Sequence, residues 1–205
     1  MLNESELRKA LPLLPPRSFK GVLFRAVDLE ALFGFHQPTP YPQPLPLFSE
    51  GARRVGARYT PIGGPASLYL AHDPQTAYAE ANRVHTQAWS GATADAPPLP
   101  PTVLISVRVR LNSILDITDI ALQQTLDTSH QELLRPWRLA QSRGHSVATQ
   151  TLGQAVFDSG VFQAIRYPST QSFEGRCLVV FPDRLIAPAS IETIDQHLNI
   201  PQRLP

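Results

Sequence analysis

Alternating apolar and polar positions predict the strands of this chain. Over 102–111 (TVLISVRVRL) apolar side chains recur at every second residue, which is the spacing of a strand with one buried face. The stretch 21–27 (GVLFRAV) has the same period and carries a charged residue, Arg25, inside it. Shorter apolar runs predict three more strands: 67–71, 161–166 and 176–181.

Helical spacing lies between these strands. Over 74–89, an alanine-rich face with spacing i, i+3, i+4 and i+7 includes Glu80 and ends at Val84. Asp73 followed by Pro74 is a typical helix start, with a capping carboxylate and a proline in the first helical position. Composition and flanking residues predict four further helices: 2–11, 119–126, 130–141 and 147–159.

Proline is about twice as frequent as in ordinary proteins, with 21 among 205 residues. It is concentrated in two segments, 37–47 and 91–101. Because proline lacks an amide donor and restricts the residue before it, neither segment can form a regular helix or a central strand. We therefore predict two long connections, of which 37–47 is an extended loop or a lid.

The order of the elements determines the expected fold class. Strands and helices are mixed without the regular rhythm of a parallel α/β sheet, which favours an α+β fold. A chain of 205 residues is long enough for one well-buried core and short for two full domains. We predict a single domain over 1–205 with its core in 21–187, and a peripheral helix at 2–11 and tail at 188–205.

Charge and composition exclude several classes of protein. Lys and Arg number 18 against 17 Asp and Glu, so the net charge of +1 lacks the basic surplus of a nucleic-acid-binding protein. The single cysteine, Cys177, excludes an internal disulfide framework. No apolar run approaches the roughly 20 residues of a membrane span, and the amino terminus is too polar for a secretory signal. We expect a cytoplasmic protein without direct membrane or nucleic-acid contacts.

The common catalytic and nucleotide-binding motifs are absent from the sequence. There is no GxGxxG opening a helix, no GxxxxGK[ST], no HExxH and no GxSxG. The six histidines never fall at metal-ligand spacing, so we predict no metal site.

Two charged residues in apolar surroundings are candidates for chemistry, because a charge there is costly unless it faces a cleft or a partner. Arg25 lies in the middle of a predicted strand, and Glu80 lies among alanines whose small side chains let a ligand approach. Each also has an ordinary interpretation. The arginine could point to water from an edge strand, and the glutamate could be a solvated helix residue.

Two loop positions are further candidates. Arg58-Tyr59 precedes Gly63 in a glycine-rich turn, and exposed backbone amides beside an arginine suit a phosphate group. Ser169 follows a strand and a proline, which fixes its hydroxyl at a strand end. The ordinary interpretations are a hairpin in the first case and a serine bonded to its own backbone in the second.

Taken together, four segments resemble the RES family, the toxins of bacterial RES–Xre toxin–antitoxin modules: FRAV; GARYTPIGGPASLYLAHDPQTAYAE; TLGQAVFDSG with IRYPS; and GRCLVVFPDRL. The resemblance spans about 22–185. The arginine, glutamate and serine that name the family fall on Arg25, Glu80 and Ser169. The family's Arg-aromatic pair falls on Arg58 with Tyr in place of the more frequent Trp.

This resemblance implies a fold like that of ADP-ribosyltransferase toxins, with mixed, mostly antiparallel sheets around an NAD cleft. It also implies cleavage of the nicotinamide–ribose bond of NAD+, which is then a substrate and not a cofactor, with inorganic phosphate as co-substrate in some members. Glu80 would stabilise the positive charge that develops on the ribose. Arg25 and Arg58 would hold phosphate groups, and Ser169 would orient a ribose or amide group.

The remaining expectations concern the rest of the substrate and the partners. Tyr59 or Tyr69 would stack on a ring of NAD+, and Gly63 belongs to the turn predicted to bind substrate. An Xre-like antitoxin is the implied partner, with a homo-oligomer or a hetero-oligomer both open. Two alternatives use the same fold: an ADP-ribosyltransferase acting on a protein or nucleic acid, and an inactive binding domain.

Overall fold

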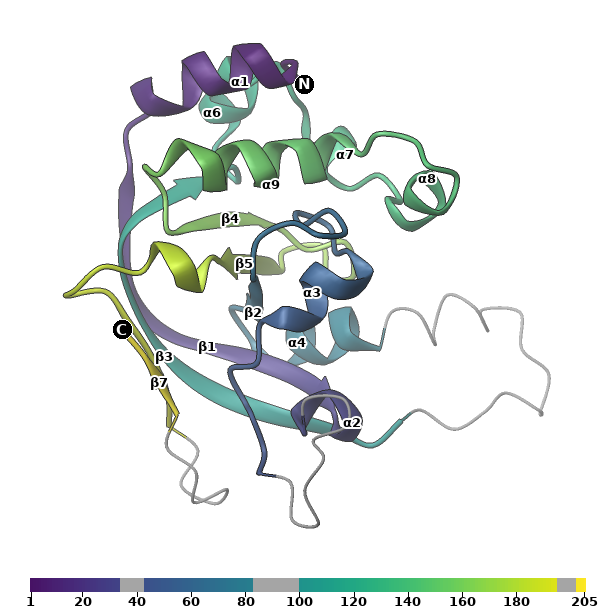
Figure 1. Ribbon diagram of the computed structural model, residues 1–205, viewed down its shortest axis with the longest axis vertical. Helices are drawn as coiled ribbons and strands as arrows, with labels where there is room; N and C mark the ends of the chain where they lie inside the picture. Colours follow the sequence, from purple (N-terminus) through teal and green to yellow (C-terminus); the bar gives the residue numbers. More distant parts are fainter. Residues whose placement is uncertain (34–42, 83–99, 195–201) are drawn as a thin grey trace.

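The computed structural model describes residues 1–33, 43–82, 100–194 and 202–205. One seven-stranded sheet bends through the molecule, with helices packed around it (Figure 1). Its order is β1-β2-β5-β4-β3-β6-β7, and β1 pairs additionally with β3. The strands are β1 (Arg17–Asp28), β2 (Leu68–Ala71), β3 (Thr102–Asp116), β4 (Ala164–Pro168), β5 (Arg176–Val180), β6 (Ser190–Thr193) and β7 (Arg203–Leu204).

The pairings close five of the strands into a ring. β1 pairs along most of its length with β3, while its Phe24 also meets Ala71 of β2. From β2 the ring continues through β5 and β4 and returns to β3. Every pairing is antiparallel except that of β3 with β4, so the mixed, mostly antiparallel character predicted for the sheet is confirmed.

Alternating side chains of the sheet enter two separate cores. On β5, Cys177 and Val179 pack with the helices, whereas Leu178 and Val180 pack inside the ring. This is the period of two that every strand imposes on its side chains. Both faces of β5 are therefore covered, which explains why its sequence is almost entirely apolar.

Eight α-helices are described. The sequence marks several of their starts. Asn3 forms a capping box with Glu6. Asp73 directly precedes Pro74, and its side chain accepts a hydrogen bond from the amide of Thr76. In Figure 1, α1 and α9 run side by side over one side of the sheet. The helices are α1 (Glu4–Ala10), α2 (Leu29–Leu32), α3 (Glu50–Val55), α4 (Pro74–Ala81), α6 (Ile120–Thr125), α7 (His130–Leu133), α8 (Arg138–Ser142) and α9 (Ala148–Ser159).

The single helix predicted over 130–141 is wrong. The structure breaks it into α7 and α8, with Pro136 in the connection. Proline supplies no amide for the helical hydrogen-bond ladder and disfavours helical backbone in the residue before it. After this break, Trp137 and Arg138 lie at a pocket that they help to line.

Both ends of the chain are more central than the sequence pattern indicated. The tail at 188–205 supplies β6, which pairs with β3 and buries Ile191 completely. At the other end, Leu7 of α1 and the following Leu11 are fully buried in the core between the helices and the sheet. Long-range strand pairing explains the first result, since a short strand carries too few residues to reveal its partner.

Parts of several predictions lie outside the described residues. These are the first part of the loop predicted over 37–47, most of the connection over 91–101, and the second half of the helix predicted over 74–89 with Val84. Within the described part of the chain, no helix is both long and apolar enough to cross a membrane.

Candidate active site

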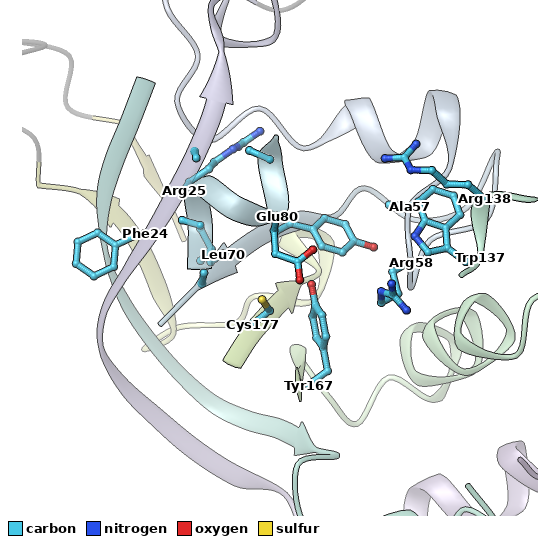
Figure 2. Close-up of a pocket in the computed structure, with 15 residues that line it drawn as sticks. Phe24, Arg25, Ala57, Arg58, Leu70, Glu80, Trp137, Arg138, Tyr167 and Cys177 are labelled. Carbon is cyan, nitrogen blue, oxygen red and sulfur yellow. The ribbon is translucent and has the colours of Figure 1, made fainter. Parts of the chain in front are cut away.

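A pocket opens where β1, β2, α4 and the α7–α8 connection meet (Figure 2). It joins residues that lie far apart in the sequence, among them Arg25, Arg58, Tyr69 and Glu80 from the predicted set. Its wall is otherwise mostly small or apolar. The lining residues are Phe24, Arg25, Ala26, Ala57, Arg58, Tyr69, Leu70, Ala71, Ala77, Glu80, Ala81, Trp137, Arg138, Tyr167 and Cys177.

Glu80 is held rigidly by the loop that follows β4. Its Oε1 accepts hydrogen bonds from the Ser169 hydroxyl at 2.6 Å, from the Thr170 amide at 2.8 Å and from the Thr170 hydroxyl at 3.3 Å. All three donors use the same oxygen, so Oε2 is the oxygen left for the pocket. Figure 2 shows the carboxylate and the Tyr167 hydroxyl turned toward one another.

Ser169 acts on the pocket through Glu80. Its hydroxyl gives its only proton to the carboxylate and accepts the amides of Gln171 at 3.0 Å and Ser172 at 3.3 Å. A serine hydroxyl has one donor and two acceptor positions, and all three are used. In this structure the hydroxyl therefore has no free position for the predicted contact with a ribose or amide group, and it is bonded to the carboxylate that lines the pocket.

Arg25 forms hydrogen bonds to the segment that precedes α3. Its Nη1 donates to the carbonyl of Pro46 at 2.9 Å and its Nη2 to that of Phe48 at 2.8 Å. Burial lowers the pKa of its guanidinium to about 10, which leaves the group charged at neutral pH. Its guanidinium points away from the Glu80 carboxylate in Figure 2, although both residues line the pocket.

Arg58 is placed by the close packing of α9 on the chain around it. A side chain at Gly153 would put its Cβ 1.8 Å from the carbonyl oxygen of Tyr59, so only glycine permits this approach. Nη1 of Arg58 donates to the carbonyls of Leu133 at 2.8 Å and Arg135 at 3.1 Å. Its Nη2 is buried and has no hydrogen-bond partner among the described residues.

The two tyrosines predicted to stack on substrate have different positions. Tyr59 is fully buried and packs on Tyr167 with ring centroids 4.6 Å apart, so it forms core and does not line the pocket. Tyr69 does line it, with a hydroxyl that accepts the Tyr59 amide and lies 2.9 Å from the Thr60 hydroxyl. Burial raises the pKa of Tyr69 to about 12, so it stays neutral.

The glycines of the turn that follows Arg58 do not line the pocket. Gly63 is exposed, with a left-handed backbone (φ of +79°), and its amide donates to the carbonyl of Arg53. The next amide, that of Gly64, donates to the carbonyl of Pro61. Because both amides already have protein acceptors, the phosphate-binding turn predicted here is not formed by these glycines.

Sequence reasoning missed Trp137 and Arg138, which form the wall opposite Glu80. The guanidinium of Arg138 lies over the Trp137 ring at 4.6 Å from its centroid. The pair Trp-Arg directly after Pro136 was the available signal, since a proline interrupts a helix and the next side chains then leave its regular faces. The position of this pair beside Arg58 depends on the tertiary structure alone.

The pocket also contains Tyr167 and Cys177, and neither is a candidate nucleophile. Burial raises the pKa of both groups above their ordinary values, and the nearby charge of Glu80 adds to the effect. Both therefore remain protonated at neutral pH, and a neutral thiol is a poor nucleophile. In the described part of the chain, no group of three or more His, Cys, Asp or Glu residues lies together as metal ligands.

Comparison with known proteins agrees with this architecture. The family model of the RES domain matches residues 24–202. The chain belongs to the RES domain family. A search of curated proteins gives no match.

Among solved structures, this RES domain is similar to a chain in the crystal structure of the MbcT–MbcA toxin–antitoxin complex of M. tuberculosis. The TM-score is 0.62 at 20% sequence identity, and the similarity covers 89% of this chain and 86% of the other. The predicted α+β fold is thereby confirmed, and it is shared with that chain.

Proposed function

We propose that this RES domain protein is the toxin of a toxin–antitoxin module and that it degrades NAD+ by cleaving the nicotinamide–ribose bond. The observation that carries the proposal is the fixed carboxylate of Glu80 in a pocket that is otherwise lined by arginines and uncharged groups. Membership in the RES family and the fold shared with the toxin–antitoxin complex support the same assignment.

The chemistry needs a negative charge beside the ribose. As the bond from C1 to the nicotinamide nitrogen breaks, its electron pair goes to the nitrogen and positive charge develops on the ribose ring. Oε2 of Glu80 is the oxygen that can face this charge, because Oε1 is held by Ser169 and Thr170. One preorganised group of this kind contributes on the order of a hundredfold to a thousandfold in rate.

The reaction needs no general acid for the leaving group. Nicotinamide is cationic while it is bound in NAD+, and it leaves as a neutral ring when it takes the bonding electrons. An oxygen of inorganic phosphate, or of a water molecule that gives up one proton to solvent, then forms the new bond to C1. This agrees with a pocket in which burial raises the pKa of Tyr69, Tyr167 and Cys177, because each of these groups is then a weak proton donor.

Arg58 is the proposed contact to the phosphate groups of the substrate. It lines the pocket and keeps a buried donor atom, Nη2, without a protein acceptor among the described residues. Arg25 has a different proposed role. Its two terminal nitrogens hold the carbonyls of Pro46 and Phe48, so it shapes the pocket by fixing that segment.

A toxin that consumes NAD+ must be held inactive in the cell that makes it. We propose that the partner is an antitoxin protein of the Xre-like type, consistent with the antitoxin in the complex that this fold matches. Coexpression with the product of an adjacent small reading frame tests this role, with rescue of growth as the expected result and unchanged toxicity as the contrary one.

The biochemical proposal is tested by incubating the purified protein with NAD+, with and without inorganic phosphate, and identifying the products by mass spectrometry. Free nicotinamide with ADP-ribose indicates hydrolysis, and nicotinamide with a phosphorylated ADP-ribose indicates phosphorolysis. Release of nicotinamide only after a protein or nucleic acid is added indicates an ADP-ribosyltransferase. No release under any of these conditions rejects the proposal.

A further inference from the structure

Two arginines face the same end of the pocket without a protein anion between them. Arg58 and Arg138 both line it, and Figure 2 shows them on either side of Trp137. Among the ion pairs of the described residues, none includes either arginine. Burial and the charge of Arg58 lower the pKa of Arg138, as expected for neighbouring like charges.

Arg58 contributes a donor that the protein itself does not use. Nη1 donates to the carbonyls of Leu133 and Arg135. Nη2 is buried and has no hydrogen-bond partner among the described residues. Arg58 as a whole is only 5% exposed. Buried charged donors without an acceptor are rare in folded proteins, because the lost hydration is not replaced. An acceptor atom supplied from the pocket would replace it.

Arg138 contributes a second set of donors, and the Trp137 ring packs against its guanidinium. Its guanidinium lies over the Trp137 ring, 4.6 Å from the centroid, and Trp137 is itself buried. The ring supports the guanidinium from one side, and the N–H groups along its edge can donate to a ligand. Arg138 is exposed, so a ligand can reach it from solvent.

The ligand that matches two guanidinium groups is a phosphoryl anion. It carries more than one negative charge and several acceptor oxygens, which match the forked donors of arginine better than a single carboxylate does. We propose that Arg58 and Arg138 form a phosphoryl-binding subsite at the α8 end of the pocket. This inference rests on the proposed function, since the occupant is either the pyrophosphate of the dinucleotide or the inorganic phosphate that attacks it.

Calorimetric titrations with ADP-ribose and with inorganic phosphate, carried out separately, test the subsite and distinguish its two sources. The variant is Arg138→Gln, and the control is Arg143→Gln, which removes the same charge from the other end of α8, outside the pocket. We expect Arg138→Gln to weaken binding on the order of tenfold or more, with the control within about twofold of wild type. If Arg138→Gln binds ADP-ribose more weakly, the occupant of the subsite is the pyrophosphate of the dinucleotide. If it binds inorganic phosphate more weakly, the occupant is the free phosphate ion.

Equal affinities in Arg138→Gln and Arg143→Gln for both probes overturn the subsite. Arg58 is tested second, as Arg58→Lys, because its side chain also holds two carbonyls and a larger change could unfold the α7–α8 connection. We expect this variant to lose affinity for the same probe as Arg138→Gln while it keeps the melting temperature near that of wild type. Unchanged affinity for that probe in Arg58→Lys removes Arg58 from the subsite.

The titrations are independent of catalysis. If wild type binds ADP-ribose, loses affinity in Arg138→Gln and yet releases no nicotinamide from NAD+, the proposed function fails and the subsite stands. If nicotinamide is released while Arg138→Gln binds both probes as Arg143→Gln does, the subsite fails and the proposed function stands.

Discussion

The pocket has two halves that differ in how its charged groups are satisfied. In one half, Arg25 and Glu80 make their hydrogen bonds to the protein itself, through Pro46, Phe48 and the loop after β4. In the other half, Arg58 keeps a buried nitrogen without a partner among the described residues. Small side chains, among them Ala57, Ala77 and Ala81, also line the pocket.

This difference separates two uses of buried charge. A charged group that several hydrogen bonds fix to the fold is immobilised, and an atom it leaves open, such as Oε2 of Glu80, can face a developing charge without reorganising. A buried donor that the fold leaves open gains its stabilisation only when a ligand supplies the acceptor. Charge alone therefore does not separate the two kinds of group in this pocket, whereas the hydrogen-bond partners of each group do.

The largest expected effect tests the immobilised carboxylate. Glu80→Gln keeps the shape of the side chain and removes its charge, so we expect nicotinamide release from NAD+ to fall roughly a hundredfold or more. The melting temperature should stay near that of wild type. The control is Glu174→Gln, which removes an exposed carboxylate from the loop that also carries Ser169. Activity retained in Glu80→Gln rejects the catalytic role of this residue.

Arg25→Ala tests the idea that a fully bonded arginine supports the fold. It leaves the carbonyls of Pro46 and Phe48 without their donors, so we expect a loss of about 1–3 kcal/mol in the free energy of unfolding in urea. Arg110→Ala, at an exposed position of β3, should change that free energy by less than about 0.5 kcal/mol. Unchanged stability with lost NAD+ binding would make Arg25 a substrate contact and remove the distinction between the two halves.

Ser169→Ala sharpens the description of the Glu80 half. The carboxylate loses its 2.6 Å hydrogen bond but keeps the Thr170 amide, so we expect kcat to fall on the order of tenfold with little change in KM. Thr170→Val keeps that amide and loses only the 3.3 Å contact, and its effect should be smaller. A rise in KM with unchanged kcat would instead indicate a direct contact between Ser169 and substrate.

The smallest effect is expected for Cys177→Ala. Burial, together with the charge of Glu80, raises the pKa of this thiol above its ordinary value, so the neutral form persists as the pH rises through about 8.5. We expect nicotinamide release within about threefold of wild type and no labelling of the wild-type thiol by iodoacetamide at a pH of about 8. Rapid labelling accompanied by inactivation would show a reactive thiol in the pocket.

Local signals in the sequence predicted much of the scaffold. Asp73 and Pro74 marked the start of α4, and Gly160 ends α9 with a left-handed backbone where the pattern placed it. The alternation over 102–111 identified the longest strand, which the structure extends to Asp116. These features depend on near neighbours, so a short window of sequence contains the physical information that determines them.

The sequence pattern was less informative wherever one segment had to be matched with another. The glycine-rich turn looked suited to phosphate, but the amide of Gly63 is used by the carbonyl of Arg53. Tyr59 looked like a stacking ring, but it is fully buried in the core. The sequence correctly placed a turn at Gly63. Contacts with residues outside the turn decided which partner the Gly63 amide has and where the Tyr59 ring lies.

By itself, the sequence determined the fold class, most element starts and the residues of the family motif, because these follow from spacing, capping and residue type. Only the tertiary structure decided that Arg58 and Arg138 line one pocket on either side of Trp137, and that Gly153 lets α9 pack closely on the backbone of Tyr59. The physical reason is distance along the chain. Contacts between segments tens of residues apart are selected by how whole elements pack, and that packing places the open donors of the pocket opposite its fixed carboxylate.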